Sequence, residues 1–328
     1  MDLLRIENLS VAFKSRSGPV LAVDRLSLTL GAGEVLAVVG ESGCGKSVTA
    51  LSVMGLLPKR NSKVTGEIHF RGRDLLTLPE EDMQAVRGNE AAMIFQEPMT
   101  SLNPVMSVGS QIAEPLRRHR GLPKGAAMKE AIRLMDRVRI PAAARRASEY
   151  PHEMSGGMLQ RVMIATALAC APKLLIADEP TTALDVTIQA QILELIKELQ
   201  AEDHMAVMFI THDMGVVAEM ADRVTVLYSG RRVETAHADE LFDSPEHPYT
   251  VGLLGSLPQL NRRGEPMLPI TGTVPDPRRM PPGCHFHPRC PFADARCRSE
   301  QPPLRPLNGH RQSACHYAPL LERLGDRV

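Results

Sequence analysis

One stretch of the chain combines glycines, a lysine and a hydroxyl in the spacing of a phosphate-binding loop. Residues 40–47 read GESGCGKS and match the pattern G-x-x-x-x-G-K-[ST] at every fixed position. Glycines let such a loop curl, so that successive backbone N–H groups point at phosphate oxygens. Lys46 would neutralise the β- and γ-phosphates of a nucleotide, and the Ser47 hydroxyl would bind Mg²⁺. The predicted phosphate-binding residues are Gly40, Glu41, Ser42, Gly43, Cys44, Gly45, Lys46 and Ser47.

The segments on either side of the loop fit the same interpretation. Val35–Val39 is a continuous apolar run, typical of a strand that is buried on both faces. Residues 48–54 can open a helix, whose N-terminus adds a partial positive charge beside the loop. A chance glycine turn is the alternative, but it does not explain why strand, loop and helix occur together.

Two adjacent carboxylates close a second apolar strand. Leu174–Ala177 is followed by Asp178 and Glu179, whose side chains point to opposite sides of a strand. Asp178 suits the Mg²⁺ shell, and Glu179 suits general-base work on the water that attacks the γ-phosphate. Taken alone, such a pair is usually a solvated strand end; after a complete phosphate loop, the catalytic interpretation is favoured.

Cys44 is expected to be a reactive thiol. The loop N–H groups and Lys46 should lower its pKa, and a thiolate is the reactive form of cysteine. We expect no catalytic role for the thiol, because the loop acts there through its backbone.

The elements that must position these residues alternate between strands and helices. Leu26, Leu28 and Leu30 alternate with polar residues as in a half-buried strand, and Gly31–Gly33 follows as a turn. Further buried runs and one helical face predict an α/β fold with a mostly parallel sheet. The runs are Ala91–Phe95, Leu174–Ala177 and Val207–Ile210, and the helical face carries Ile188, Ile192, Leu195, Ile196 and Leu199. Residues 98–153 contain no buried strand run and predict a helical insert.

Composition narrows the class of protein. The chain has 328 residues, of which 43% are hydrophobic, and 38 basic residues balance 38 acidic ones. A chain of this length is expected to form more than one compact unit, and a balanced charge gives no support for a nucleic-acid binder. No apolar run approaches the roughly 20 residues of a spanning helix. Asp2 and the lack of a basic segment before an apolar one argue against a secretory signal, so we expect a cytosolic chain.

The chain after Pro245 is rich in proline and holds four clustered cysteines. We expect this tail to have little core of its own, so that something else must order it. The cysteines, at positions Cys284, Cys290, Cys297 and Cys315, follow neither a paired zinc pattern nor a ferredoxin run. They could hold [4Fe–4S] or Zn²⁺, with His285, His287, His310 and His316 as further zinc ligands, or could be reduced structural thiols.

Four further motifs, in order along the chain, resemble those of ABC-type ATPases. Met154–Met158 (MSGGM) resembles the family signature, Gln96 the Q-loop, Ala183–Asp185 (ALD) the D-loop, and His212 the switch histidine. The resemblance implies an ATP-hydrolysing dimer in which the phosphate loop of one subunit faces Ser155, Gly156 and Gly157 of the other. It also implies that Gln96 joins Ser47 and Asp178 around Mg²⁺, that Glu179, His212 and Gln96 are catalytic, and that Asp185 belongs to the D-loop.

Two positions test how far this resemblance extends. Phe13 follows the first predicted strand, as the adenine-stacking aromatic of the family does, although a core role is an equal alternative. Met158 stands where the commonest signature has Gln, and Met cannot make that polar contact. We expect ATP binding to survive this departure.

The tail resembles one branch of the family. HPYT at 247–250, Leu253-Leu254 and SLP at 256–258 resemble the extension of ATP-binding subunits of bacterial dipeptide/oligopeptide importers, some of which carry an iron–sulfur cluster there. The resemblance implies a P-loop NTPase cassette with a mixed sheet at 1–97 and 154–245, a helical subdomain at 98–153, and an extension at 246–328. It implies ATP, Mg²⁺ and a [4Fe–4S] cluster held by the four cysteines.

The same resemblance implies the partners and leaves several functions open. The expected partners are a second ATP-binding subunit, two permease subunits and, indirectly, an extracytoplasmic solute-binding protein, at the cytoplasmic face of the inner membrane. Import of nickel, a glycoside or another solute is an alternative to peptide import. Two other functions are less consistent with the sequence. A single cassette argues against a soluble ABC ATPase that acts on DNA or ribosomes, and intact motifs argue against a redox sensor with a vestigial cassette.

Overall fold

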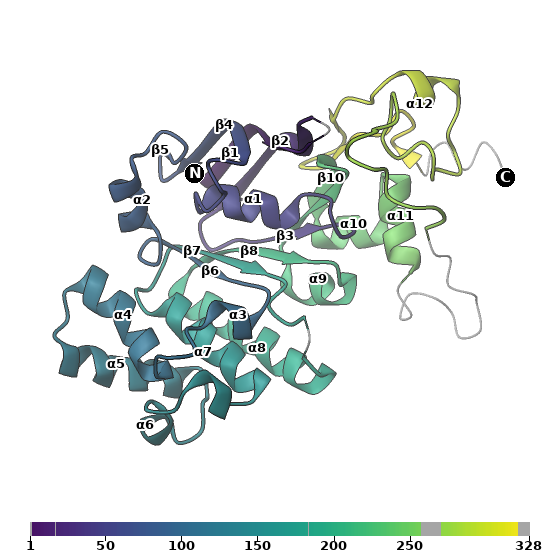
Figure 1. The fold of residues 1–328 in the computed structure, drawn as a ribbon. Coiled ribbons are helices and arrows are strands. Elements are labelled where there is room, and N and C mark those ends of the chain that lie inside the picture. Colours follow the sequence, from purple (N-terminus) through teal and green to yellow (C-terminus); the bar gives the residue numbers. More distant parts are fainter. Residues whose placement is uncertain (1, 17, 183, 257–269, 321–328) are drawn as a thin grey trace. The chain divides into compact units, whose positions relative to one another are not determined.

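The computed structural model describes residues 2–16, 18–182, 184–256 and 270–320 (Figure 1). The chain divides into two compact units. Unit 1 comprises Gly31–Glu34 and Thr77–Phe209. Unit 2 comprises Asp2–Leu30, Val35–Leu76 and the chain from Ile210 onward. Within the part of the chain that the structure describes, no helix is both long enough and apolar enough to cross a membrane.

Unit 2 begins with a small antiparallel sheet. Its strands lie in the order β2-β1-β4-β5, with β1 and β4 antiparallel and β4 and β5 antiparallel. The strands are β1 (Asp2–Phe13), β2 (Val20–Gly31), β4 (Ser62–Phe70) and β5 (Arg73–Asp74). The leucines at 26, 28 and 30 are buried and alternate with half-buried polar residues, which confirms the predicted strand.

A second group of strands in unit 2 joins the phosphate loop to the C-terminal part of the chain. The order is β11-β12-β10-β9-β3, where β3 runs parallel to β9 and the other pairs are antiparallel. The strands are β3 (Val35–Val39), β9 (Arg223–Tyr228), β10 (Arg231–His237), β11 (Arg305–Pro306) and β12 (Gln312–Ser313). The helices of unit 2 are α1 (Lys46–Val53), α9 (Met214–Met220), α10 (Ala238–Asp243), α11 (Pro248–Gly255) and α12 (Ala295–Ser299).

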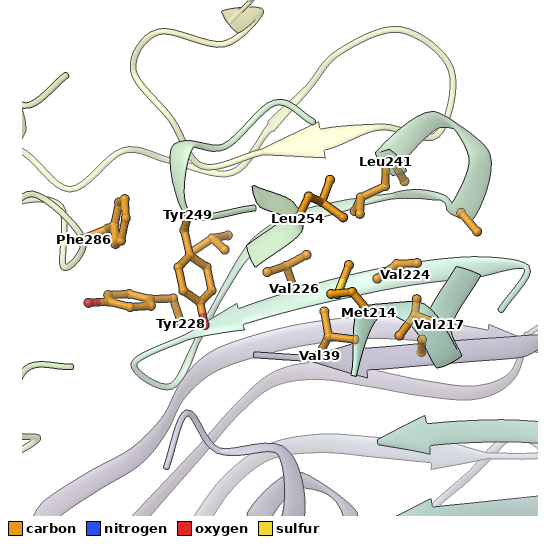
Figure 2. Packing of buried hydrophobic residues seen from close by; sticks show 14 residues of the cluster. Val39, Met214, Val217, Val224, Val226, Tyr228, Leu241, Tyr249, Leu254 and Phe286 are labelled. Carbon is orange, nitrogen blue, oxygen red and sulfur yellow. The ribbon is translucent and has the colours of Figure 1, made fainter. Parts of the chain in front are cut away.

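The C-terminal extension shares one hydrophobic core with this sheet. Figure 2 shows Val39, Val224 and Val226 from the strands facing side chains of α9, α10 and α11. Tyr249 and Leu254 of α11, and Phe286 beyond it, are buried in the same cluster. The tail is therefore ordered in part by packing against β9 and β10, a source of order that its proline-rich composition did not reveal.

Unit 1 contains the strands that carry the paired carboxylates. β6 (Ala91–Ile94) runs parallel to β7 (Leu174–Asp178), and β8 (Ala206–Thr211) follows in the order β8-β7-β6. The helices α2 (Glu80–Val86), α7 (Gly156–Leu168) and α8 (Val186–Asp203) complete this part. The predicted face of α8 is buried at Ile192, Leu195, Ile196 and Leu199, whereas Ile188 is half-buried.

Residues 98–153 are helical and contain no strand, as the sequence predicts. Gly109 lets α4 approach α6 closely, because a Cβ there would lie 2.7 Å from the Ala147 carbonyl oxygen. α4 ends at Gly121, which adopts the left-handed conformation (φ 65°). The elements are α3 (Pro98–Ser101), α4 (Val108–Arg120), α5 (Lys124–Arg137), α6 (Ala143–Arg146) and the 3₁₀ turn η1 (Pro151–Glu153).

Candidate functional site

The phosphate loop lies between β3 and α1, and its glycines are required by its shape. Gly40, Gly43 and Gly45 all have positive φ (148°, 80° and 103°). A Cβ on Gly40 would lie 2.2 Å from the Leu227 carbonyl oxygen, and one on Gly45 would lie 2.7 Å from that of Ala22. Both the conformation and the close approach of other backbone therefore favour glycine at these positions.

Lys46 is folded into the loop that it is expected to serve. Its side chain is 5% exposed, and its Nζ donates to the carbonyl oxygens of Gly40 (2.6 Å) and Glu41 (3.3 Å). Lys46 and Ser47 form the first turn of α1, where helix N–H groups also favour an anion. A cation and a helix N-terminus therefore meet in one curled loop, which is the arrangement that binds phosphates.

Cys44 is not the reactive thiol that its neighbours suggested. The side chain is 1% exposed, and burial raises the pKa of this thiol, an effect that the nearby Lys46 charge only partly offsets. Because the thiolate is the reactive form, Cys44 is a protected thiol and the prediction is wrong. A Cβ on Gly40 would lie only 2.8 Å from the Cys44 sulfur, so the thiol packs closely against the start of the loop.

Glu41 contacts the C-terminal extension through both its backbone and its side chain. Its N–H donates to the Tyr249 hydroxyl (2.8 Å), and its carboxylate oxygens accept from Arg289 at 2.6 and 3.0 Å. Both the N–H and the carboxylate of Glu41 are therefore engaged by groups of the C-terminal extension.

In unit 1, the paired carboxylates and the Q-loop glutamine lie together. Asp178 ends β7 and is 5% exposed, and Glu179 follows it in the left-handed conformation (φ 47°). The Glu179 Oε2 accepts hydrogen bonds from Gln96 Nε2 and Thr182 Oγ1, both at 3.0 Å. The geometry brings two of the predicted catalytic residues into direct contact and holds the carboxylate of Glu179 in place.

The signature residues begin α7, and Asp185 begins α8. Ser155 is the exposed N-cap residue of α7, and Gly156 and Gly157 form its first turn. A Cβ on Gly157 would lie 2.8 Å from Ile188 Cγ2, so glycine lets the start of α7 approach α8. Asp185 accepts a hydrogen bond from the Ile188 N–H (3.0 Å) and caps α8, whereas Ala183 of the D-loop lies outside the described residues.

The remaining predicted residues of unit 2 lie at strand ends. Phe13 is the half-buried last residue of β1, and His212 is exposed immediately after β8. The adenine contact of Phe13 and the γ-phosphate contact of His212 stay predictions. Of the tail motif at 256–258, Leu257 and Pro258 lie outside the described residues.

The four clustered cysteines of unit 2 line one cavity. Burial raises the pKa of Cys290 to about 12 and that of Cys315 to about 11, and it also raises the pKa of Cys284 and Cys297. Of the four histidines considered as zinc ligands, His287 and His316 line the cavity. The lining residues are His247, Pro248, Cys284, Phe286, His287, Cys290, Phe292, Cys297, Pro302, Cys315, His316 and Tyr317.

Comparison with known proteins identifies the family to which the chain belongs. Residues 23–182 match the family described as "ABC transporter", and residues 233–297 match "Oligopeptide/dipeptide transporter, C-terminal region". A protein of Brucella abortus (strain 2308) named "Putative peptide import ATP-binding protein" is 53% identical over 95% of this chain and 94% of its own length. Another from Brucella ovis, with the same name, is 51% identical over 95% of this chain and 96% of its own. The chain belongs to the family of ATP-binding subunits of dipeptide/oligopeptide ABC importers.

Solved structures agree with this family. A dimeric ATP-binding cassette bound to ADP and Pi has a TM-score of 0.64 and 28% identity, over 72% of this importer ATPase and 98% of its own chain. The cbiO1 protein from Clostridium perfringens, part of an ABC transporter complex, has a TM-score of 0.62 and 27% identity. It covers 77% of this chain and 95% of its own. The fold is an ABC ATPase cassette, α/β with a mixed sheet, and the subunit hydrolyses ATP.

Two residues of the importer ATPase that contact the loop were missed by sequence reasoning. No sequence motif marks Arg289, which lies in a proline- and cysteine-rich segment 248 positions from its partner Glu41. Tyr249 belongs to the HPYT motif, which marked the branch but not the contact. The separation in sequence hides both residues from any local pattern.

Proposed function

We propose that this subunit hydrolyses ATP to power the import of di- and oligopeptides through partner membrane subunits. The observation that carries the proposal is the complete phosphate loop, with Lys46 buried in it, in a chain that matches peptide import ATP-binding proteins over 95% of its length. Two permease subunits, a second ATP-binding subunit and a solute-binding protein are the partners that this role requires. The subunit would act at the cytoplasmic face of the inner membrane.

Each predicted residue then has a chemical task. The loop N–H groups and Lys46 would bind the phosphates, and Phe13 would stack on adenine. Ser47, Asp178 and Gln96 would hold Mg²⁺, which neutralises phosphate charge when bound. Glu179 would accept a proton from the attacking water, and Gln96 orients the carboxylate of Glu179 through the observed hydrogen bond.

The signature segment would complete the site of another subunit. Ser155 and Gly156 are exposed at the start of α7, where backbone N–H groups favour an anion. We therefore expect a dimer in which this segment contacts the γ-phosphate of the ATP held by the partner, with Asp185 nearby and His212 contacting the γ-phosphate held by its own subunit.

The substrate is tested by the solute that stimulates hydrolysis. The chain should be purified with its permease and binding-protein partners in membranes, and ATP hydrolysis should be measured with di- and oligopeptides, Ni²⁺ and a glycoside. Peptides are expected to stimulate hydrolysis. Stimulation by Ni²⁺ or the glycoside, with none by peptides, would overturn the peptide assignment and leave the ATPase assignment intact.

We further propose that Cys284, Cys290, Cys297 and Cys315 hold a [4Fe–4S] cluster. Four thiols around one buried cavity are a suitable donor set, and metal binding would offset the cost of forming buried thiolates. Zinc at 2.3 Å from each sulfur would require sulfurs about 3.8 Å apart. Within the described part of the chain, no three of these sulfur and histidine nitrogen atoms lie within 4.8 Å of one another. This spacing does not match a closed zinc site, and we favour the cluster because the extension resembles that of importer subunits that carry one.

Metal analysis of anaerobically purified protein distinguishes the possibilities. We expect a brown protein with about four iron atoms per chain, and loss of the colour when any of the four cysteines is changed to serine. Cys170→Ser, at a buried cysteine outside the cavity, is the matched control and should keep the colour. Stoichiometric zinc without iron, or no metal at all, would overturn the cluster.

A further inference from the structure

Glu41 places a negative charge inside a loop that is built to bind an anion. It is the second residue of the loop, and its side chain is 30% exposed. A carboxylate here repels nucleotide phosphates unless another group neutralises it. The loop would therefore work poorly if Glu41 were left alone.

Arg289 supplies that neutralising charge from the C-terminal extension. Its two terminal nitrogens donate to the two carboxylate oxygens of Glu41 at 2.6 and 3.0 Å, a bidentate ion pair. The Arg289 side chain is 3% exposed, so solvent screens this pair weakly.

Arg289 is itself held in place by groups that surround it. Its Nε donates to the Thr271 carbonyl oxygen (3.0 Å), and a terminal nitrogen donates to that of Ile270 (3.4 Å). The guanidinium lies 5.9 Å from the centre of the Tyr228 ring, which adds a cation–π contact. These contacts fix the guanidinium beside the Glu41 carboxylate.

Tyr249 holds the backbone of the same loop residue. Its hydroxyl accepts the Glu41 N–H at 2.8 Å, and its ring is fully buried. The ring packs against Tyr228 (4.7 Å between centroids) and Phe286 (5.4 Å), which Figure 2 shows beside it. The start of the loop is thus attached to the extension by its backbone as well as by its charge.

We propose that Arg289 and Tyr249 are positioning residues for ATP: Arg289 neutralises and orients Glu41, and Tyr249 fixes the loop backbone, so that the phosphate site is complete only when the extension is docked. This inference rests on the proposed role of the loop in binding ATP. It means that the C-terminal extension contributes to the affinity for ATP, although it lies far from the phosphate loop in the sequence.

The inference predicts a specific pattern of ATP affinities in the full-length chain. Arg289→Met leaves the carboxylate unpaired and should raise the Kd for Mg-ATP about tenfold, because like charges oppose each other in a weakly screened site. Adding Glu41→Gln removes that charge and should return the Kd to within about threefold of the wild type. Arg289→Lys keeps the charge and should have an intermediate effect. Tyr249→Phe should raise the Kd about threefold, without rescue by Glu41→Gln.

The measurements are isothermal titration with Mg-ATP and steady-state hydrolysis in the purified transporter. The KM of Arg289→Met should rise with the Kd while kcat stays within about twofold, because the loop binds phosphates alike in the ground and transition states. Arg278→Met is the matched control, because Arg278 is exposed in the same extension and pairs with Asp276. Its Kd should be unchanged.

Two outcomes would overturn the inference. One is an unchanged Kd in a folded Arg289→Met protein, and the other is a double variant at least as weak as Arg289→Met. If Arg289→Met does not fold, a folded Arg289→Gln protein with a wild-type Kd would equally contradict it. Failure of the proposed function would differ, since a Lys46→Ala variant would then bind ATP as the wild type does.

Discussion

The phosphate loop and the signature segment both present backbone N–H groups at the start of a helix, but their surroundings differ. At the start of α1, Lys46 is 5% exposed and the loop is attached to the C-terminal extension through Glu41. At the start of α7, Ser155 and Gly156 are exposed, and the Ser155 side chain caps no N–H of its own helix. One helix start is enclosed by its own unit, and the other is open to solvent.

This difference indicates that the two helix starts have different roles. An enclosed anion site with its own cation can bind phosphates within one chain. The backbone N–H groups of an exposed helix start are available to an anion that is carried by another molecule. Binding of ATP should therefore depend on the loop, whereas hydrolysis should depend on the exposed groups as well.

Glu179→Gln should have the largest effect on turnover and little on binding. Removing the base while keeping the shape of the side chain should slow hydrolysis by roughly 10²–10⁴-fold. Gln96 and Thr182 can still donate to the remaining amide oxygen, so the local structure should persist. ATP should remain bound and stabilise a dimer or heterodimer in size-exclusion chromatography. Loss of ATP binding would show that Glu179 is structural.

Ser155→Ala should have a smaller effect of the same kind. Removing one hydroxyl donor at the γ-phosphate of a partner's nucleotide should slow hydrolysis by about 10–100-fold. The Kd of the isolated chain for Mg-ATP should stay within about twofold, because Ser155 is absent from the loop. A tenfold rise in that Kd would contradict the claim that ATP binding by the isolated chain depends on the phosphate loop and not on the start of α7.

Glu234→Gln should leave hydrolysis nearly unchanged but alter how stability depends on pH. Glu234 is 1% exposed on β10, and burial raises its pKa to about 7 from the ordinary 4.5. The folded state therefore keeps a proton that the unfolded state loses, so stability present below about pH 4.5 is lost as pH rises through about 7. The loss is up to about 3 kcal/mol.

Thermal unfolding at pH 5 and pH 8 checks this expectation. The difference between the two pH values should shrink in Glu234→Gln, whose amide does not ionise. Glu246→Gln is a useful contrast, because the Glu246 carboxylate pairs with Arg311 and accepts the Leu320 N–H. That change should destabilise the protein at both pH values. An unaltered pH dependence in Glu234→Gln would mean that another group causes it.

The sequence predicts local chemistry well because the loop motif is local. Residues 40–47, the flanking strand and the following helix form one continuous segment, so pattern and structure coincide. The strands at 91–94 and 174–178 are likewise continuous apolar runs that a buried sheet demands.

Burial and long-range contacts explain what the sequence did not predict. Lys46 lies two positions after Cys44 in the motif, but the desolvation of the Cys44 thiol, which outweighs the effect of the Lys46 charge on its pKa, comes from the packing of the loop. The ion pair of Glu41 with Arg289 joins residues 248 positions apart. The composition of the tail predicts little hydrophobic core, but Tyr249, Leu254 and Phe286 pack against strands from elsewhere in the chain. The domain boundaries at 97, 153 and 245 remain a prediction.

The most direct test of the account is the binding of Mg-ATP to the full-length Lys46→Ala protein. Isothermal titration on one purified chain avoids any contribution from a second ATP-binding subunit. We expect the wild type to bind Mg-ATP and Lys46→Ala to bind it at least ~10²-fold more weakly, because the main charge facing the phosphates is gone. A folded Lys46→Ala protein that binds ATP with the wild-type Kd would contradict the account.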